Sequence, residues 1–318
     1  MGKEYDFIVI GAGGTGLAAG MYAARLGLKT LVLGHSNGSE LPIGGVITTT
    51  NVVENYPGFI KLTGTELAEK IEKHAREYEL VEIKTEKAES VKGKAGKFFV
   101  KTKKNEYLGK TILFATGTKW KKLPESVKGA REFEHRGIAY CSLCDAPLFK
   151  GKVTCVIGGS DTAAKDALVL AEHAKKVYII YRKDKIRAEP VNLKRIGNNK
   201  KIEVINNANV VEIRGKDFVE SVVLDREFNG SKELRLDGVF VAIGHEVLSE
   251  LAKDLGVKLN EKNEIIMNHR DSSTNIDGVF AAGDVGDKHF KQAITGVAEG
   301  CTAAHSAYEF IQKSIIET

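Results

Sequence analysis

The chain has 318 residues and a formal net charge of +5, with 42% hydrophobic and 28% charged residues. This length predicts about two domains, and the composition is that of a folded protein rather than a disordered one. The basic residues are scattered, which argues against nucleic acid as a partner, and no apolar run approaches the ~20 residues of a membrane span. The N-terminus shows no signal-peptide pattern and cysteines number only four, so we expect a cytoplasmic protein in a reducing compartment.

The chain opens with a nucleotide-binding pattern. A buried-strand run at 6–10 leads into G-x-G-x-x-G at 11–16, helical spacing over 17–25 and a second strand at 30–33. In this setting the glycines permit a tight turn, close approach of a pyrophosphate and close packing of helix on strand. The second strand ends in Gly34-His35, with no acidic residue to hold the ribose of NAD. The motif therefore favours FAD.

Residues 44–58 are rich in glycine and hydroxyl side chains. Gly44 and Gly45 precede three threonines outside a regular helix pattern. Such a segment suits a backbone surface that lies against a flat ring, although an ordinary loop has the same composition.

A helix is predicted over 63–78, because Thr63 and Glu66 form a capping-box pattern at its start. Alternating hydrophobicity then predicts an antiparallel meander near 81–92, 97–103 and 106–115. The last of these strands stops at Gly117, where a strand end can contact a cofactor. The polar residues 118–136 suit a linker.

The most informative stretch is a pair of cysteines two residues apart, Cys141 and Cys144, followed directly by Asp145. We expect the pair at the start of a helical turn, where N–H groups and the helix dipole favour a thiolate. Such a pair can close into a small disulfide ring and reopen by thiolate attack. Asp145 is placed to carry the proton of each cycle.

Two other interpretations of the cysteine pair are weaker. A zinc site needs further ligands at close spacing, and the other cysteines, Cys155 and Cys301, stand alone. A static structural disulfide closing so short a loop would restrict the unfolded chain little. Cys155 lies in a strand pattern and Cys301 in a helix pattern, so both are expected to serve packing.

The opening pattern then recurs. A strand at 153–157, a turn at 158–163, a helix at 164–174 and a strand at 176–180 predict a second dinucleotide fold. Where NAD proteins carry an acidic residue, this strand is followed by Arg182, Lys183 and Arg187. Three cations favour the 2′-phosphate of NADPH over NADH, although a solvated basic turn has the same composition.

The rest of the chain repeats the earlier plan. A second meander is predicted near 203–206, 209–214, 218–225 and 232–236, followed by a strand at 238–244 and a helix at 248–255. A last strand over 278–283 ends in Asp284, which is placed to bond a sugar-like chain. The C-terminal helix is expected over 291–313, and its N-terminus is a site for an anion or a dipole.

Taken together, these motifs resemble the low-molecular-weight thioredoxin reductases of prokaryotes and archaea, which belong to the pyridine nucleotide-disulfide oxidoreductases. The resemblance runs nearly from end to end. It rests on the glycine motif at 11–16, residues 44–45 and 54–58, residues 115–117, 141–145 and 182–187, Gly244-His245, and residues 283–293.

The resemblance implies an α/β fold of two Rossmann-like, three-layer dinucleotide-binding domains, the second inserted into the first. Residues 1–118 and 247–318 would bind FAD, and residues 119–246 would bind NADPH and carry the redox disulfide. Electrons would pass from NADPH through FAD to Cys141–Cys144 and then to a thioredoxin or a similar small disulfide protein. The resemblance also implies a homodimer. Within each chain the two domains would rotate between states, a motion that can limit turnover.

The resemblance also implies roles for individual residues. Cys144 would lie against the flavin, Cys141 would attack thioredoxin and Asp145 would be the acid–base group. The predicted FAD-binding residues are Gly11, Gly13, Gly14, Gly16, Gly44, Gly45, Val46, Thr49, Asn55, Ala115, Thr116, Gly117, Gly283, Asp284, Lys291, Gln292 and Ala293. The predicted NADPH-binding residues are Gly158, Ser160, Asp161, Thr162, Arg182, Lys183 and Arg187.

Several residues depart from the family pattern, in both the nicotinamide half and the flavin half. Ser160 replaces a glycine at the site of closest phosphate approach, Val46 replaces a glutamine in the flavin loop and Lys291 replaces an arginine. The altered turn keeps open a flavin-dependent disulfide reductase with another electron donor, such as ferredoxin. The intact Cys141, Cys144 and Asp145 argue against an NAD(P)H oxidase or a ferredoxin–NADP reductase. A non-enzymatic redox sensor stays open on the sequence alone.

Overall fold

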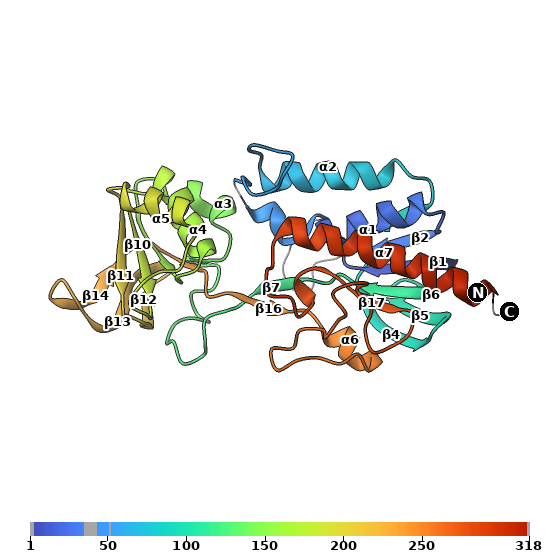
Figure 1. Ribbon diagram of the computed structural model, residues 1–318. Coiled ribbons are helices and arrows are strands. Elements are labelled where there is room, and N and C mark those ends of the chain that lie inside the picture. Colours follow the sequence, from blue (N-terminus) through green and yellow to red (C-terminus); the bar gives the residue numbers. More distant parts are fainter. Residues whose placement is uncertain (1–2, 35–42, 51, 317–318) are drawn as a thin grey trace. The chain divides into compact units, whose positions relative to one another are not determined.

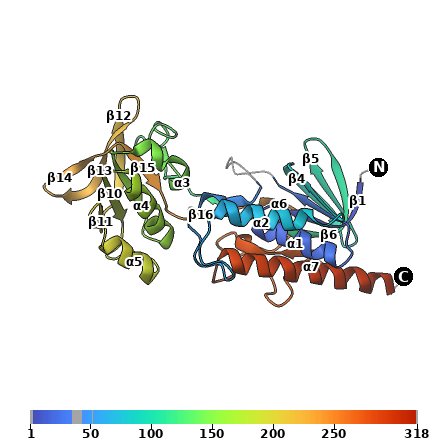
Figure 2. The same cartoon turned by 90° about the horizontal axis from the view of Figure 1, so that it is seen from above.

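The computed structural model describes residues 3–34, 43–50 and 52–316, with side chains through residue 313. His35, which ends the second predicted strand, lies outside these ranges. The chain forms two compact units (Figures 1 and 2), one from Met1–Lys119 with Val247–Thr318 and the other from Trp120–Glu246.

The first unit is built on a seven-stranded sheet. Its strands are β1 Lys3–Ile10, β2 Thr30–Leu33, β3 Val81–Lys84, β4 Ala88–Lys94, β5 Lys97–Thr102, β6 Glu106–Phe114 and β17 Val279–Ala281. Strand order is β3-β2-β1-β6-β5-β4, and β17 also pairs with β6. The strands β1, β2, β3, β6 and β17 run parallel to their neighbours, whereas β4 and β5 join β6 as an antiparallel meander.

The prediction of one meander strand over 81–92 was wrong. The structure divides this segment: β3 pairs in parallel with β2, from Thr30 opposite Val81 onward, and β4 begins the meander at Ala88. The alternating pattern runs through both strands, and a period of two residues carries no information about the partner strand.

Helices cover both faces of this sheet. They are α1 Gly14–Arg25, α2 Gly64–Arg76, α6 Glu250–Leu255 and α7 Ala293–Ile316, together with short 3₁₀ turns at Gly45–Thr49 and Gly283–Val285. The helices α1, α2 and α7 lie on one side and α6 on the other (Figure 1). Small side chains such as Ala19 and Ala303 let α1 and α7 pack closely over Val9, and Ile8 packs with Ala252 on the opposite face. Parallel strands buried on both faces explain the continuous apolar runs of the sequence.

The predicted helix after residue 63 is confirmed in its start. α2 begins after Thr63, whose side chain accepts the N–H of Glu66, while the Glu66 carboxylate accepts the N–H of Thr63. Both bonds of the capping box are therefore present, and they satisfy backbone donors that the helix leaves free.

The second unit has a five-stranded parallel sheet of order β11-β10-β9-β15-β8. Its strands are β8 Ile138–Ala139, β9 Val153–Ile157, β10 Lys176–Tyr181, β11 Ile202–Asn206 and β15 Gly238–Val241, and its helices are α3 Ser142–Asp145, α4 Asp161–His173 and α5 Pro190–Gly197. A separate antiparallel sheet contains β12 Val210–Gly215, β13 Val219–Phe228 and β14 Ser231–Arg235. Residues 203–206 were predicted in this meander but lie in β11, parallel to β10.

The two segments that connect the units run side by side. β7 Thr118–Trp120 and β16 His245–Val247 form a two-stranded sheet. The Lys121 N–H donates to Gly244 O (3.0 Å), and the Leu248 N–H donates to Gly117 O (3.0 Å). The predicted linker 118–136 therefore begins with a strand.

The predicted fold class is confirmed: the chain has two α/β nucleotide-binding folds, the second inserted into the first. Within the described residues, no helix is both long and apolar enough to cross a membrane.

Candidate functional site

The two cysteines of the C-x-x-C motif form a disulfide at the start of a short helix. Cys141 is the N-cap of α3, and its sulfur accepts the backbone N–H of Cys144 (3.1 Å). The turn follows the end of β8 and is short because Pro147 lies in the next 3₁₀ turn. Cys141 is buried, whereas Cys144 is exposed. The structure therefore confirms the predicted helical turn, in which Cys144 is the more exposed of the two cysteines.

Asp145 ends the same helix, and its backbone N–H donates to Cys141 O (3.1 Å). Burial raises the pKa of the Asp145 carboxyl above its ordinary value, while the charge of His135 opposes that rise. A carboxyl with a raised pKa holds and releases a proton nearer to neutral pH, which suits a group that serves a dithiol.

Sequence reasoning missed a second carboxyl near the disulfide. Ser142, between the two cysteines, donates its hydroxyl to Oδ1 of Asp166 on α4 (2.6 Å). Burial raises the pKa of Asp166 to about 6, and the bond from Ser142 works against that rise. No motif marks this pair, because its residues lie 24 positions apart and come from different elements.

In the first unit, the predicted FAD-binding segments meet at the ends of the parallel strands. Gly11 has a φ of +118°, and an added Cβ would lie 2.2 Å from Ala115 O. A Cβ on Gly16 would lie 1.8 Å from Gly11 O. These two glycines let strand, turn and helix come together, as the G-x-G-x-x-G motif predicts.

Other predicted segments join the same place. Gly13 forms a bridge with Gly44, and Gly283 packs so closely on Thr15 that a Cβ would lie 2.8 Å from its Oγ1. A Cβ on Gly13 would lie 3.7 Å from Gly44 O, an ordinary van der Waals contact, and Gly13 is only partly buried. This turn leads directly into the N-terminus of α1, which is the kind of place where a dinucleotide's pyrophosphate binds.

Residues far apart in sequence complete this region. The Asn55 amide donates to Oε1 of Gln292 (3.0 Å), 237 residues along the chain. Lys291 bonds Glu264 (2.6 Å) and the backbone oxygen of Asp284 (2.8 Å), which fixes the segment before α7. The predicted segments around Gly11, Gly44, Asn55, Asp284 and Gln292 thus gather in one unit.

A buried ion pair supports this region and was not predicted. Lys288 bonds Oε2 of Glu299 (2.9 Å) and Oγ1 of Thr295 (3.1 Å), and its side chain is 6% exposed. The same Glu299 oxygen accepts the N–H of Gly283 (2.8 Å). The pair therefore ties the turn that carries Asp284 to α7. Glutamate inside an amphipathic helix ordinarily indicates a solvated face, so no pattern in the sequence indicates this contact.

The second nucleotide turn is also assembled. The Arg187 N–H donates to Gly159 O (2.6 Å), and Ser160 bridges to Arg187, which brings the cationic segment to the turn that begins α4. The side chains of Arg182, Lys183 and Arg187 are exposed, and among the described residues none bonds an acidic group. These cations are available to an anionic ligand.

Asp161, the first residue of α4, uses its carboxylate within the protein. It accepts the Glu189 N–H (2.8 Å) and the Asn192 amide (2.8 Å), and it pairs with Lys165 (2.8 Å). These contacts outweigh burial and lower its pKa. The carboxylate thereby anchors the start of α5 to that of α4.

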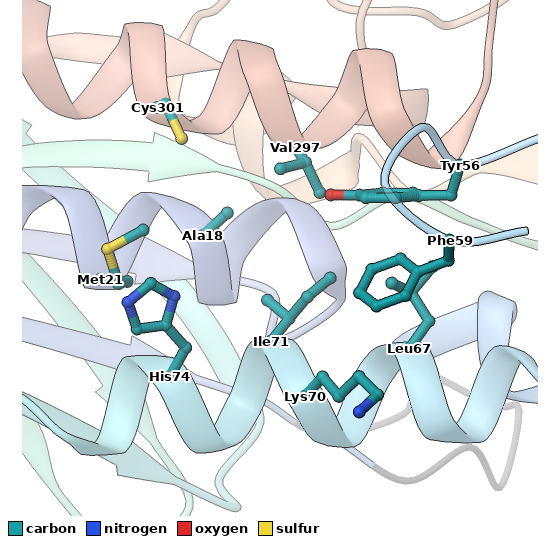
Figure 3. A pocket seen from close by; sticks show the side chains of 10 residues that line it. All are labelled: Ala18, Met21, Tyr56, Phe59, Leu67, Lys70, Ile71, His74, Val297 and Cys301. Atoms are coloured by element: carbon teal, nitrogen blue, oxygen red, sulfur yellow. The ribbon is translucent and has the colours of Figure 1, made fainter. Parts of the chain in front are cut away.

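The first unit also contains a pocket of about 280 Å³ between α1, α2 and α7 (Figure 3). Tyr56 and Phe59 lie at one end of the pocket, and Lys70, Ile71 and His74 line it from α2. The lining residues are Ala18, Met21, Tyr56, Phe59, Leu67, Lys70, Ile71, His74, Val297 and Cys301. None of these is a predicted cofactor residue. Burial raises the pKa of the Cys301 thiol, which makes it a poor nucleophile.

Comparison with known proteins agrees with this geometry. The family model for pyridine nucleotide-disulphide oxidoreductases matches residues 5–300. A thioredoxin reductase of Bacillus subtilis (strain 168) is 37% identical over 317 residues, which cover 98% of this chain and 96% of that protein. The chain belongs to the thioredoxin reductase family. The predicted family and the predicted enzyme class, a flavoprotein oxidoreductase, are confirmed.

Solved structures support this membership. The thioredoxin reductase of Lactococcus lactis superposes with a TM-score of 0.90 at 34% identity, covering 97% of this chain and 99% of that one. That of T. acidophilum gives a TM-score of 0.89 at 35% identity, covering 98% and 99%. A ferredoxin-flavin thioredoxin reductase of Clostridium acetobutylicum is a more distant neighbour, with a TM-score of 0.52 at 31% identity over 98% and 100%.

Proposed function

We propose that this thioredoxin reductase uses NADPH and FAD to reduce the Cys141–Cys144 disulfide, and that the resulting dithiol reduces a thioredoxin or a similar small protein. The observation that carries this proposal is the disulfide itself, which lies at the start of α3 with Cys144 an exposed residue and Asp145 directly after it. A static cross-link over so short a loop would stabilise the fold little, whereas a dithiol–disulfide pair at this spacing can open and close by thiolate attack.

The chemistry of the dithiol can be assigned to residues of this chain. Reducing the disulfide takes two electrons and two protons; NADPH releases two electrons and one proton as hydride, and solvent supplies the second proton. Cys141 is proposed to attack the substrate disulfide, because the Cys144 N–H that its sulfur accepts would stabilise a thiolate. Asp145 is proposed to move the proton as the dithiol forms and closes.

FAD is proposed to bind where the segments of the first unit meet. The turn at Gly11 and Gly13 and the N-terminus of α1 would hold its pyrophosphate, and Asp284 its sugar-like chain. The segments at Gly44 and Gln292 would hold its ring. When bound, FAD supplies a two-electron carrier between the nicotinamide and the disulfide.

NADPH is proposed to bind the second nucleotide turn, with its 2′-phosphate on Arg182, Lys183 and Arg187. Their lack of acidic partners within the described part of the chain supports this placement. The family resemblance supports a homodimer, and the free thiols of Cys155 and Cys301 support a reducing cytoplasm.

Anaerobic addition of NADPH is expected to bleach the visible flavin band of the purified protein, and NADH is expected to do so far less readily. Arg187→Ala should weaken the binding of NADPH by about 10- to 100-fold, which is the value of one charge-assisted hydrogen bond. It should leave the binding of NADH unchanged. The measurement is the rate of bleaching against nucleotide concentration.

The matched control for this test is Lys185→Ala, because Lys185 is an exposed cation of the same segment outside the predicted set. Equal bleaching by both nucleotides would contradict the proposed 2′-phosphate site. A flavin that dithionite reduces but neither nucleotide bleaches would favour another donor, such as ferredoxin.

Glu299→Ala is expected to weaken the retention of FAD. The substitution removes the acceptor of the Gly283 N–H and leaves the Lys288 ammonium buried without its anion. Removing one partner of a buried ion pair lowers the free energy of unfolding by about 3–5 kcal/mol. The turn that carries Asp284 would loosen as a result. Bound flavin per mole of protein after dialysis checks this result.

The control for Glu299 is Glu309→Ala, since Glu309 is an exposed residue of the same helix. That variant should retain flavin as the unmodified protein does. Equal flavin content in the Glu299 and Glu309 variants would show that the ion pair does not support the cofactor region.

A further inference from the structure

Asp166 links the redox turn to the helix that starts at the second nucleotide turn. α4 begins at Asp161, directly after the turn at 158–160, and Asp166 lies in its second turn. Its Oδ1 accepts the hydroxyl of Ser142 at 2.6 Å. Ser142 is 3% exposed and stands between the two cysteines. The bond therefore holds α3 from its buried side.

The Asp166 carboxylate has few bonding partners within the described part of the chain. Among the described residues, Ser142 is the group that bonds it, and the neighbouring Lys165 is paired with Asp161 instead (2.8 Å). Burial raises the pKa of Asp166 to about 6, so the carboxyl is largely ionised at pH 7 and above. An ionised acceptor makes the bond from the Ser142 hydroxyl a strong one.

We propose that Asp166 is a positioning residue for the redox disulfide, which fixes α3 through Ser142 so that the Cys144 N–H remains directed at the Cys141 sulfur. This inference rests on the proposed function, in which Cys141 attacks the substrate. In the reduced protein the same N–H would stabilise the Cys141 thiolate. Loosening α3 would therefore make Cys141 less ionised and less reactive.

The test measures the ionisation of Cys141 directly. In a Cys144→Ser background, which keeps the backbone N–H of residue 144, Cys141 is the one thiol left in α3. The ultraviolet absorbance of its thiolate is followed against pH in the chemically reduced protein. Adding Ser142→Ala is expected to raise the Cys141 pKa by about one unit, which is a tenfold fall in its ionisation constant.

Variants of the acceptor separate positioning from a general loss of structure. Asp166→Ala should raise the Cys141 pKa by as much as Ser142→Ala does. The double variant should raise it no further than either single variant, because both substitutions remove the same bond. Asp166→Asn keeps an acceptor oxygen and should restore much of the lost ionisation. Lys165→Ala is the control on the same helix and should change nothing, since it leaves the Ser142–Asp166 bond intact.

Two results would overturn the proposal. One is an unchanged Cys141 pKa in either Ser142→Ala or Asp166→Ala, with folding checked by circular dichroism. The other is full additivity of these two variants. The measurement uses neither NADPH nor thioredoxin, so its outcome is independent of whether the proposed reductase activity is found.

Discussion

Cys144→Ser is expected to abolish reduction of a thioredoxin disulfide while the protein stays yellow with bound FAD. The substitution removes one sulfur of the bond between Cys141 and Cys144, so no disulfide can form to accept electrons. The loss should be on the order of a thousandfold or more, the scale seen when a covalent nucleophile is removed. FAD should remain, because α3 belongs to the second unit and the segments proposed to hold FAD to the first.

NADPH-dependent reduction of thioredoxin and flavin absorbance per mole of protein measure this prediction together. Cys301→Ser is the matched control, since Cys301 is a partly buried free cysteine outside the disulfide. It should keep both activity and flavin. Undiminished thioredoxin reduction by Cys144→Ser would refute the role assigned to the disulfide.

The same variant also tests the proposed division of labour between the two sulfurs. If Cys141 attacks the substrate, Cys144→Ser should accumulate a mixed disulfide between Cys141 and thioredoxin, because no neighbouring thiol resolves it. Cys141→Ser should not trap the partner in this way. The greater exposure of Cys144 makes the comparison informative, since exposure alone would favour the opposite assignment.

The sequence predicted the parts of this protein whose geometry is local. The turn at Gly11, the capping box at Thr63 and the C-x-x-C turn each depend on residues within a few positions, and the structure contains each of them. The fold class followed because the strand–turn–helix–strand pattern occurs twice. Family resemblance, rather than periodicity, supplied the expectation that one fold is inserted into the other.

The errors have a common cause. Residues 81–92 and 203–206 alternate as strands do, but the pattern does not reveal whether a strand pairs in parallel or antiparallel fashion. The contacts of Ser142 with Asp166 and of Lys288 with Glu299 were missed because they form only when separate elements pack. A charged residue in a helix pattern is ordinarily exposed, so no sequence signal distinguishes these buried partners.

Gly16→Ala is expected to prevent stable folding of the first unit and so to abolish flavin binding. The new Cβ would lie 1.8 Å from Gly11 O and 3.1 Å from a Val9 methyl. The first clash is with backbone, so a change of side-chain rotamer cannot relieve it and α1 would have to move away from β1. We expect a destabilisation of about 4 kcal/mol or more, at the upper end for single substitutions.

Gly13→Ala is the comparison that separates the fold from the cofactor. Gly13 has φ −76° and ψ 178°, which alanine adopts readily, and its Cβ would meet no atom of the described chain closer than 3.7 Å. The protein should therefore fold. The Cβ would instead occupy space that the pyrophosphate needs, and FAD affinity should fall tenfold or more, about 1.4 kcal/mol.

Circular dichroism and bound flavin per mole of protein distinguish the two variants. Gly16→Ala should lose both signals, whereas Gly13→Ala should keep the folded spectrum and lose flavin. If Gly13→Ala retained all of its flavin, the pyrophosphate would have to bind somewhere other than this turn. A folded Gly16→Ala protein with full flavin would mean that α1 can leave β1 without disturbing the nucleotide turn, which the contact between Gly16 and Gly11 argues against.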